Sequence, residues 1–126
     1  MNKNRIESYK ENLNKLLQKE EGYFIIFEDI RTNKFVQFQA STKAKQLLFD
    51  VPTREQVLSR EQIEKLNNLL VFECDSVELF SGKDPFEVSF IDKTEYAAEI
   101  IERIFLEVFN LPNEYTLTIT LDSFVG

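Results

Sequence analysis

The spacing of apolar residues changes repeatedly along this 126-residue chain, and the order of the changes restricts the fold more than any other feature. Apolar residues at every third or fourth position are typical of a helix, whereas alternation or a short apolar run is typical of a strand. Helical spacing covers the N-terminus to about residue 20, 59–70 and 94–109. Strand patterns cover 23–27, 35–40, 47–51, part of 71–80, 86–90 and 115–121. The order α-βββ-α-ββ-α-β predicts an α+β fold, a single antiparallel sheet with packed helices, in one domain over residues 1–126.

Local signals set several boundaries of these segments. The polar stretch 29–34 predicts a turn that joins the first two strands into a hairpin. Ser59-Arg60-Glu61-Gln62 matches the capping box, so the second helix is expected to start at about Ser59. Thr94 is expected to cap the third helix, and Asn110 and Pro112 to end it.

Alternation in the strands divides the apolar residues between the two faces of the sheet. The last strand places its large apolar residues on one face and threonines on the other, but the first and third strands are apolar on both faces. If the helices cover one face only, the other would expose a contiguous apolar patch of Phe24, Ile26 and Leu48, joined by Phe35 and Ile91. Such a patch would indicate partner binding or a homodimer. Alternatively, the first helix covers this second face, or the strand assignments slip by one residue.

Negative charge is concentrated in the last 56 positions. Residues 71–126 carry 12 Asp and Glu against 3 Lys and Arg, a net −9, whereas residues 1–70 carry a net +2. Glu95, Glu99 and Glu102 recur at i, i+4 and i+7, and we expect them to form a row on the outer face of the third helix. A field of this sign favours a basic protein partner and disfavours nucleic acid.

The residues that most enzymes use are missing. The chain has no histidine, and its three glycines are too far apart for a phosphate-binding loop. Cys74 lies between two acidic residues, which raise rather than lower the pKa of a thiol. Glu73, Asp75 and Glu78 do not fit a calcium loop, because phenylalanines stand where its glycine and closing glutamate belong. We therefore expect no enzymatic activity, no cofactor and no metal.

The cellular location is also predicted from what the chain contains. The N-terminal segment mixes charges and has no apolar stretch of the kind found in signal peptides. No run approaches the roughly 20 apolar residues of a membrane-spanning helix. A single cysteine forms no disulfide framework. We expect a cytoplasmic protein without a membrane partner.

Several segments resemble those of a bacterial domain family. They are Lys34-Phe35-Val36-Gln37-Phe38, Leu47-Leu48-Phe49-Asp50-Val51-Pro52, a helix opening at Ser59, Ala97-Ala98-Glu99-Ile100-Ile101 and Val108-Phe109-Asn110-Leu111-Pro112. Together they resemble the YbjN-like and TY-Chap domains, which are similar in fold to type III secretion chaperones. The resemblance covers residues 20–122. Relatives commonly carry a Gly-Trp-like pair after the second helix, where this chain has Leu69-Leu70-Val71-Phe72.

The resemblance implies a noncatalytic domain that binds another protein, often a secreted effector or toxin. The leading hypothesis is therefore a secretion-chaperone-like or adaptor domain, which engages its partner through the sheet and an acidic helical surface. The alternative is an immunity protein that neutralises a basic toxin, with Glu95, Glu99 and Glu102 imitating an anionic substrate. The two hypotheses differ in whether the target is a disordered segment or a folded active site.

Overall fold

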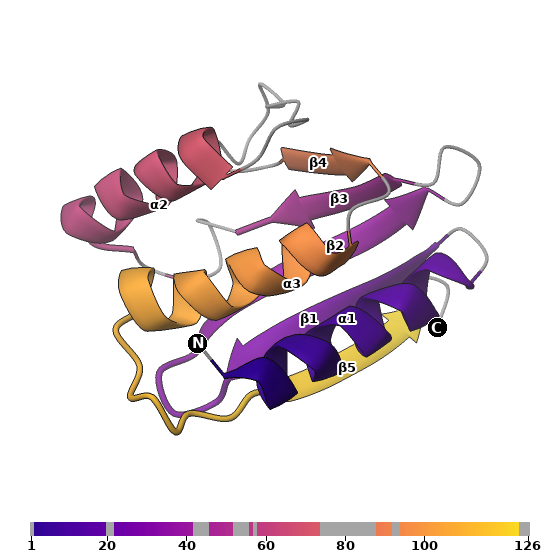
Figure 1. Ribbon diagram of the computed structural model, residues 1–126, viewed down its shortest axis with the longest axis horizontal. Helices are drawn as coiled ribbons and strands as arrows, with labels where there is room; N and C mark the ends of the chain where they lie inside the picture. The colour runs from indigo at the N-terminus through magenta and orange to yellow at the C-terminus, as the bar shows by residue number, and fades with distance from the viewer. Residues whose placement is uncertain are drawn as a thin grey trace.

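The protein has an α+β fold, as the order of its segments predicts (Figure 1). The computed structural model describes residues 2–19, 22–41, 46–51, 56, 58–73, 88–91 and 94–123. The elements in these ranges are α1 (Lys3–Leu17), β1 (Tyr23–Asp29), β2 (Lys34–Ser41), β3 (Gln46–Asp50), α2 (Arg60–Glu73), β4 (Val88–Ile91), α3 (Thr94–Arg103), the π-helical turn η1 (Ile104–Val108) and β5 (Thr118–Ser123).

The described strands form one antiparallel sheet in the order β4-β3-β2-β1-β5. The predicted hairpin of β1 and β2 is confirmed. Asn33 adopts a left-handed φ of 57° in its turn, and the hydroxyl of Thr32 donates to Asp29 Oδ2 at 2.6 Å. After α3 and η1 the chain returns to the sheet beside the first strand, where β5 pairs with β1 on the side opposite β2. β5 therefore forms one edge of the sheet.

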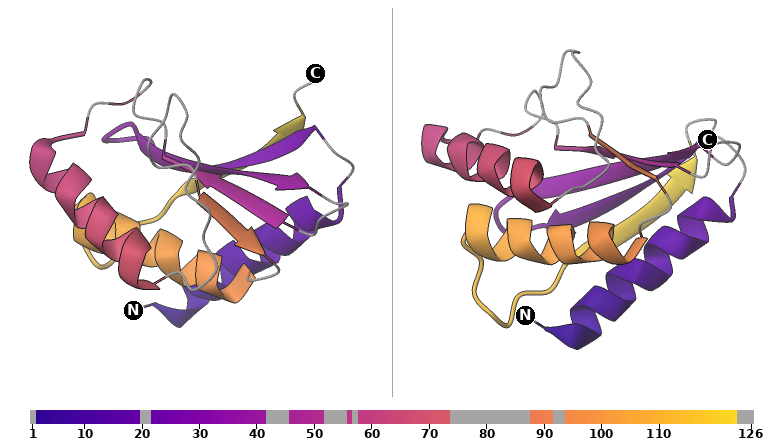
Figure 2. Two further views of the ribbon diagram at one scale, coloured as in Figure 1. Left: turned by 90° about the horizontal axis from the view of Figure 1, so that it is seen from above. Right: turned by 45° about the horizontal axis from the view of Figure 1, so that its top comes forward.

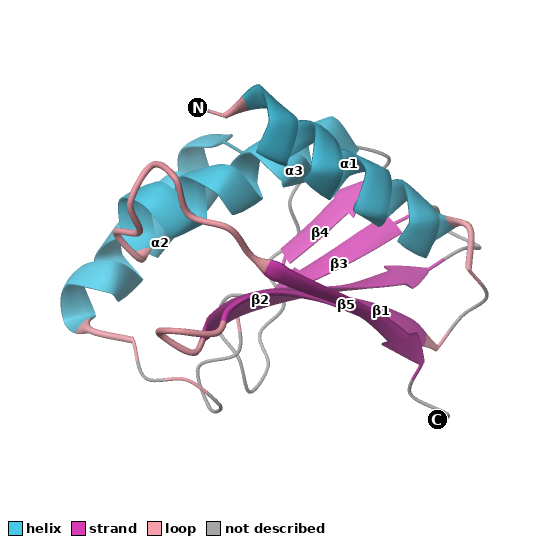
Figure 3. Ribbon diagram, turned by 90° about the horizontal axis from the view of Figure 1, so that it is seen from below, coloured by secondary structure: helices cyan, strands magenta, loops and turns pink. Residues whose placement is uncertain are grey.

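All three helices of the described chain lie on the same face of the sheet (Figure 3). α3 lies in the middle of this layer, with α1 on one side and α2 on the other (Figures 1 and 2). The alternative in which the first helix covers the second face is therefore wrong. Burial of the helical stripes against one sheet face gives a single core, which is rich in phenylalanine.

The core side of the sheet is a row of aromatic side chains. Phe27 on β1, Phe38 on β2 and Phe49 on β3 are fully buried, and their ring centroids are 6.0 and 5.1 Å apart along the row. The ring of Tyr9 on α1 packs edge-to-face with that of Phe27, with the ring centroids 5.4 Å apart. Such offset and edge-on pairs add to the free energy of burying large rings. The faces that strand alternation predicted for β1, β2 and β3 are thus the observed ones.

The capping box at the start of α2 is confirmed. Gln62 N–H donates to the Ser59 hydroxyl at 3.1 Å, and Ser59 N–H donates to the Gln62 side chain at 2.9 Å. Asn110 has a φ of 55° after η1, as expected for a residue that ends a helix.

Two predicted boundaries were wrong. Val71–Glu73 belongs to α2 rather than to a strand, because the apolar run simply continues the helix without a stop signal. The rest of that predicted strand, 74–80, lies outside the described residues, as do 86 and 87 of the next. The last strand starts at Thr118 and not at Tyr115. The backbone at Tyr115 is already engaged, since its N–H bonds Pro112 O at 3.0 Å and its carbonyl accepts from Arg5.

Candidate functional site

The sheet face that the helices leave uncovered is the first candidate surface, and we call it the open face. The β1–β2 and β2–β3 registers place Phe24, Ile26, Phe35 and Leu48 on it, as predicted. All four side chains are partly accessible rather than buried. The β3–β4 register places Ile91 at a position on the same face, opposite Gln46.

Polar side chains separate these apolar residues. Gln39 stands between Phe24 and Leu48 in one cross-strand row, and Gln37 stands beside Ile26 in the next. Phe35 lies diagonally from Ile26, within the reach of an aromatic side chain. The predicted patch is thus a mixed surface, on which apolar groups alternate with amides that can exchange hydrogen bonds with a ligand.

The charge of the open face is negative. Asp122 is exposed beside Phe24, Glu28 is partly accessible beside Phe35, and Asp50 is buried and accepts from Gln37 at 3.0 Å. The open-face positions of the described strands hold no Lys or Arg. A ligand for this surface would have apolar anchors with cationic groups around them.

A side-chain amide bonds the backbone at the start of β2. Gln56 is buried, accepts from Phe35 N–H at 3.0 Å and donates to Phe35 O at 2.8 Å. β3 ends at Asp50, opposite Gln37, so it does not reach Phe35. Gln56 therefore takes the place of a neighbouring strand, and it fixes the backbone of one apolar residue of the open face.

The second candidate surface, the acidic row on α3, does not exist as predicted. Glu95 is exposed and Glu99 is partly accessible, but Glu102 is fully buried. The prediction failed because α1 packs along α3 and covers the side of the helix that carries Glu102. Two neighbouring acidic residues remain on the accessible surface of α3, which is too little to form a distinct binding face.

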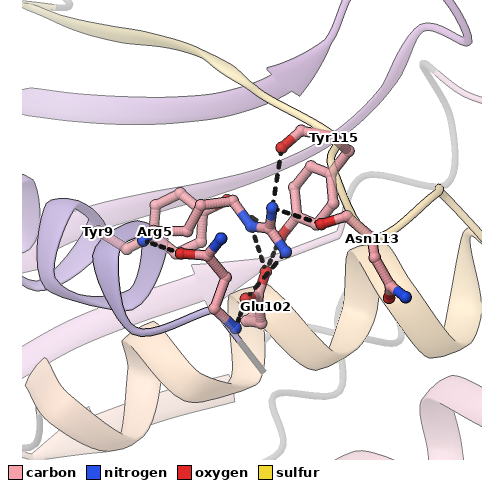
Figure 4. A network of polar contacts seen from close by, with 6 residues as sticks. Arg5, Tyr9, Glu102, Asn113 and Tyr115 are labelled. Carbon is pink, nitrogen blue, oxygen red and sulfur yellow. Dashed lines mark hydrogen bonds and ion pairs between the residues drawn. The ribbon is translucent and has the colours of Figure 1, made fainter.

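Glu102 is the centre of a buried polar network instead (Figure 4). Arg5 of α1 donates to it through two nitrogens, Nε to Oε1 at 2.8 Å and Nη2 to Oε2 at 3.2 Å. Asn2 N–H donates to Oε2 at 2.9 Å, and the Tyr115 hydroxyl donates to Oε1. Tyr9 in turn donates to the Tyr115 hydroxyl at 3.0 Å. The carboxylate thus accepts from the N-terminus of α1 and from the segment before β5.

The same arginine fixes the chain between η1 and β5. Arg5 Nη1 donates to Asn113 O at 2.7 Å and to Tyr115 O at 3.1 Å, and its Cζ lies 4.0 Å from the centroid of the Tyr115 ring (Figure 4). A planar guanidinium is suited to this combination of a bidentate ion pair and a ring contact. The network therefore determines where the chain enters β5.

The protonation states in the network follow from its contacts. Burial alone would raise the pKa of Glu102, but the hydrogen bonds from Arg5, Tyr115 and Asn2 hold that pKa below its usual value. Burial raises the pKa of Tyr9 to about 12. Burial and the hydrogen bond to the Glu102 carboxylate raise the pKa of Tyr115 as well. At neutral pH the network therefore holds one ion pair, between Arg5 and Glu102, and two neutral phenols.

A further feature of the described surface is a hollow next to the turn after β1. A hollow of about 430 Å³ lies between the turn after β1 and residues 112–118, beside Ile30, whose side chain is 62% exposed. Its charged lining residues are Asp29, Arg31 and Glu114. Within the described ranges, no three Asp, Glu, His or Cys side chains come together in a way that could bind a metal ion. No described helix has the length and apolar character needed to cross a bilayer.

Sequence reasoning missed the polar residues that organise the fold, namely Arg5, Tyr9, Gln56 and Tyr115. One signal for Glu102 was present. It lies between Ala98, at i−4, and Phe105, at i+3, and both are core residues. A glutamate flanked in this way stands at the border of the apolar stripe, where a neighbouring helix can cover it.

Comparison of this chain with protein-family models, with curated proteins and with solved structures found no match. The functional argument therefore depends on the open face itself.

Proposed function

We propose that this is a noncatalytic protein-binding domain, chaperone-like or adaptor-like, that binds a basic and partly apolar segment of another protein on its open face. One observation carries the proposal: the described helices cover only one face of the sheet, and the other face, at the positions of the described strands, combines apolar, amide and acidic side chains and holds no Lys or Arg. The cytoplasm fits such a role, because the chain has one cysteine and so no internal disulfide. Its resemblance to secretion-chaperone-like domains suggests an effector or toxin as the partner.

The composition of the open face favours a flexible segment over a rigid surface. Phe24, Ile26 and Phe35 are spread over two strands, and amide side chains stand between them. A segment that orders on binding places its apolar residues one at a time and meets the amides with its own backbone. Affinity per unit area is modest in such complexes, while the contact surface is large.

The immunity hypothesis loses its mechanism in this structure. It required Glu95, Glu99 and Glu102 to imitate an anionic substrate together. The carboxylate of Glu102 is fully buried and bound by Arg5, so it is inaccessible to a toxin. We therefore retain the hypothesis of a chaperone-like or adaptor domain.

A capture experiment with two isoleucine variants tests the proposal. Ile26→Glu adds a charge in the middle of the open face, whereas Ile30→Glu makes the same change at an exposed residue outside it. We expect the wild type and Ile30→Glu to retain the same protein from a host-cell extract, and Ile26→Glu to lose it by at least about tenfold. Retention should weaken as salt is raised, because the partner is basic.

Two results would overturn the proposal. Equal retention by Ile26→Glu and the wild type would remove the open face from the interface. Capture of a nucleic acid or a small metabolite in place of a protein would exclude the proposed class of partner.

A further inference from the structure

The edge strand β5 carries an inference that does not depend on the proposed partner. The hydrogen bonds of Phe35 on β2 fix which backbone groups of β1 point towards β5, and therefore which backbone groups of β5 point away from the sheet at its edge. Phe35 N–H and C=O bond Gln56 and so point away from β1, which makes Glu28 and Phe35 a non-hydrogen-bonded pair of that ladder. The backbone groups of Glu28 must then point to the other side, towards β5 and Thr118.

The alternation of an antiparallel ladder extends this assignment along β5. Thr118, Thr120 and Asp122 direct their backbone groups to β1, whereas Ile119 and Leu121 direct theirs away from the sheet. Within the described chain, β5 has no neighbouring strand on that side (Figure 1). The N–H of Ser123 is already engaged, since it donates to Asp122 Oδ1 at 2.7 Å.

β5 has no proline, lysine or bulge, and Asp122 is its one charged residue. Protected edges usually contain proline, lysine or a bulge, or are very short. β5 is six residues long, with the sequence Thr-Ile-Thr-Leu-Asp-Ser, and its register with β1 is unbroken. β4, at the opposite edge, has only four residues.

We propose that β5 pairs antiparallel with the β5 strand of a second copy of this chain, around a two-fold axis at Thr120. This register lets Ile119 and Leu121 of each copy exchange N–H···O=C bonds with Leu121 and Ile119 of the other. On the open face, Thr120 then meets Thr120, and Thr118 meets Asp122. Threonine pairs stabilise a sheet, and no like charges stand opposite each other. A pairing register with the two-fold axis at Asp122 would instead place the Asp122 carboxylates of the two copies opposite each other.

The pairing joins the open faces of the two copies. Ile26 lies beside Thr120 within each copy, so the two apolar surfaces continue across the seam with only the paired threonines between them. Contact between two edge strands buries little area, which places this dimer in the weak class of interfaces. Each chain carries a charge of −7, so added salt should strengthen the dimer by screening the repulsion.

Sedimentation of the purified chain alone tests the inference. We expect a concentration-dependent dimer, half formed at about 10 µM to 1 mM and tighter in high salt. Thr120→Lys should reduce association at least about tenfold, because it places two cations face to face at the axis. Thr116→Lys makes the same change at an exposed residue before the strand, and it should dimerise like the wild type.

Mixing complementary variants separates an effect on the interface from an effect on folding. Thr120→Lys and Thr120→Glu should each be monomeric alone and should associate when mixed. A wild-type chain that is monomeric at about 1 mM overturns the inference. So does a Thr120→Lys variant that associates as strongly as the wild type, or a mixture that stays monomeric.

Discussion

Replacement of Glu102 by glutamine should destabilise the protein strongly without changing the shape of the side chain. The carboxylate is fully buried and accepts four hydrogen bonds, from Arg5 Nε, Arg5 Nη2, Asn2 N–H and the Tyr115 hydroxyl. The amide of glutamine keeps one accepting oxygen. Its NH2 group replaces the other oxygen, so the donors that bonded that oxygen would face another donor. It also leaves the Arg5 guanidinium, whose side chain is 13% exposed, without its counter-ion.

The expected loss is about 3–5 kcal/mol, the range for breaking a buried ion pair by removing one member. That is a large part of the roughly 5–15 kcal/mol by which a domain is stable. With a urea dependence of about 2 kcal/mol per molar, the unfolding midpoint should fall by about 2 M. Equilibrium unfolding in urea, followed by circular dichroism, measures this shift.

Glu99→Gln is the matched control, because it makes the same change on the accessible side of α3. Its free energy of unfolding should stay within about 0.5 kcal/mol of the wild-type value. Equal midpoints for Glu102→Gln and Glu99→Gln would refute the reasoning. A double-mutant cycle with Arg5→Gln sharpens the test, since the coupling should be about 0.5–3 kcal/mol, and additive effects would mean that the pair contributes nothing.

Two further predictions follow from the same structure. Because the folded-state pKa of Glu102 lies below its usual value of 4.5, the unfolded state takes up the proton first as the pH falls. The stabilisation by the Glu102 carboxylate should therefore be present above about pH 4.5 and be lost below it. As the pH falls, the urea midpoint of Glu102→Gln should decrease less steeply than that of the wild type. Equal slopes of midpoint against pH for the two proteins would contradict this prediction. Gln56→Ala removes both partners of the Phe35 backbone, so it should cost about 1–3 kcal/mol and speed hydrogen exchange at Phe35, unlike Gln18→Ala at an exposed site. A Phe35 exchange rate that does not change would show that the amide has no strand-like role.

The elements that could be predicted from the sequence are those fixed by neighbouring residues. The hairpin follows from two alternating segments around a polar turn, and the capping box at Ser59 needs only four residues. The assignment of Phe24 and Ile26 to the open face also follows from alternation alone. These signals act over a few positions, so a single sequence contains them completely.

The parts that could not be predicted depend on contacts between distant segments. The burial of Glu102 requires α1 to lie beside α3, and the residues concerned, Arg5 and Glu102, are 97 positions apart. Gln56 replaces a strand because β3 happens to end opposite Gln37. Periodicity defines the faces of one helix or strand, but it does not say which neighbour covers a face.

The most direct test of the central claim is to map where a basic amphipathic ligand contacts the protein. A short synthetic peptide of leucine and lysine serves as the probe, and amide chemical shifts of the labelled protein report its position. We predict that the largest shifts occur on the open face, at Phe24, Ile26, Phe35 and Leu48, and that they diminish with added salt. Shifts confined to the outer face of α3, or to the hollow beside Ile30, would contradict the account.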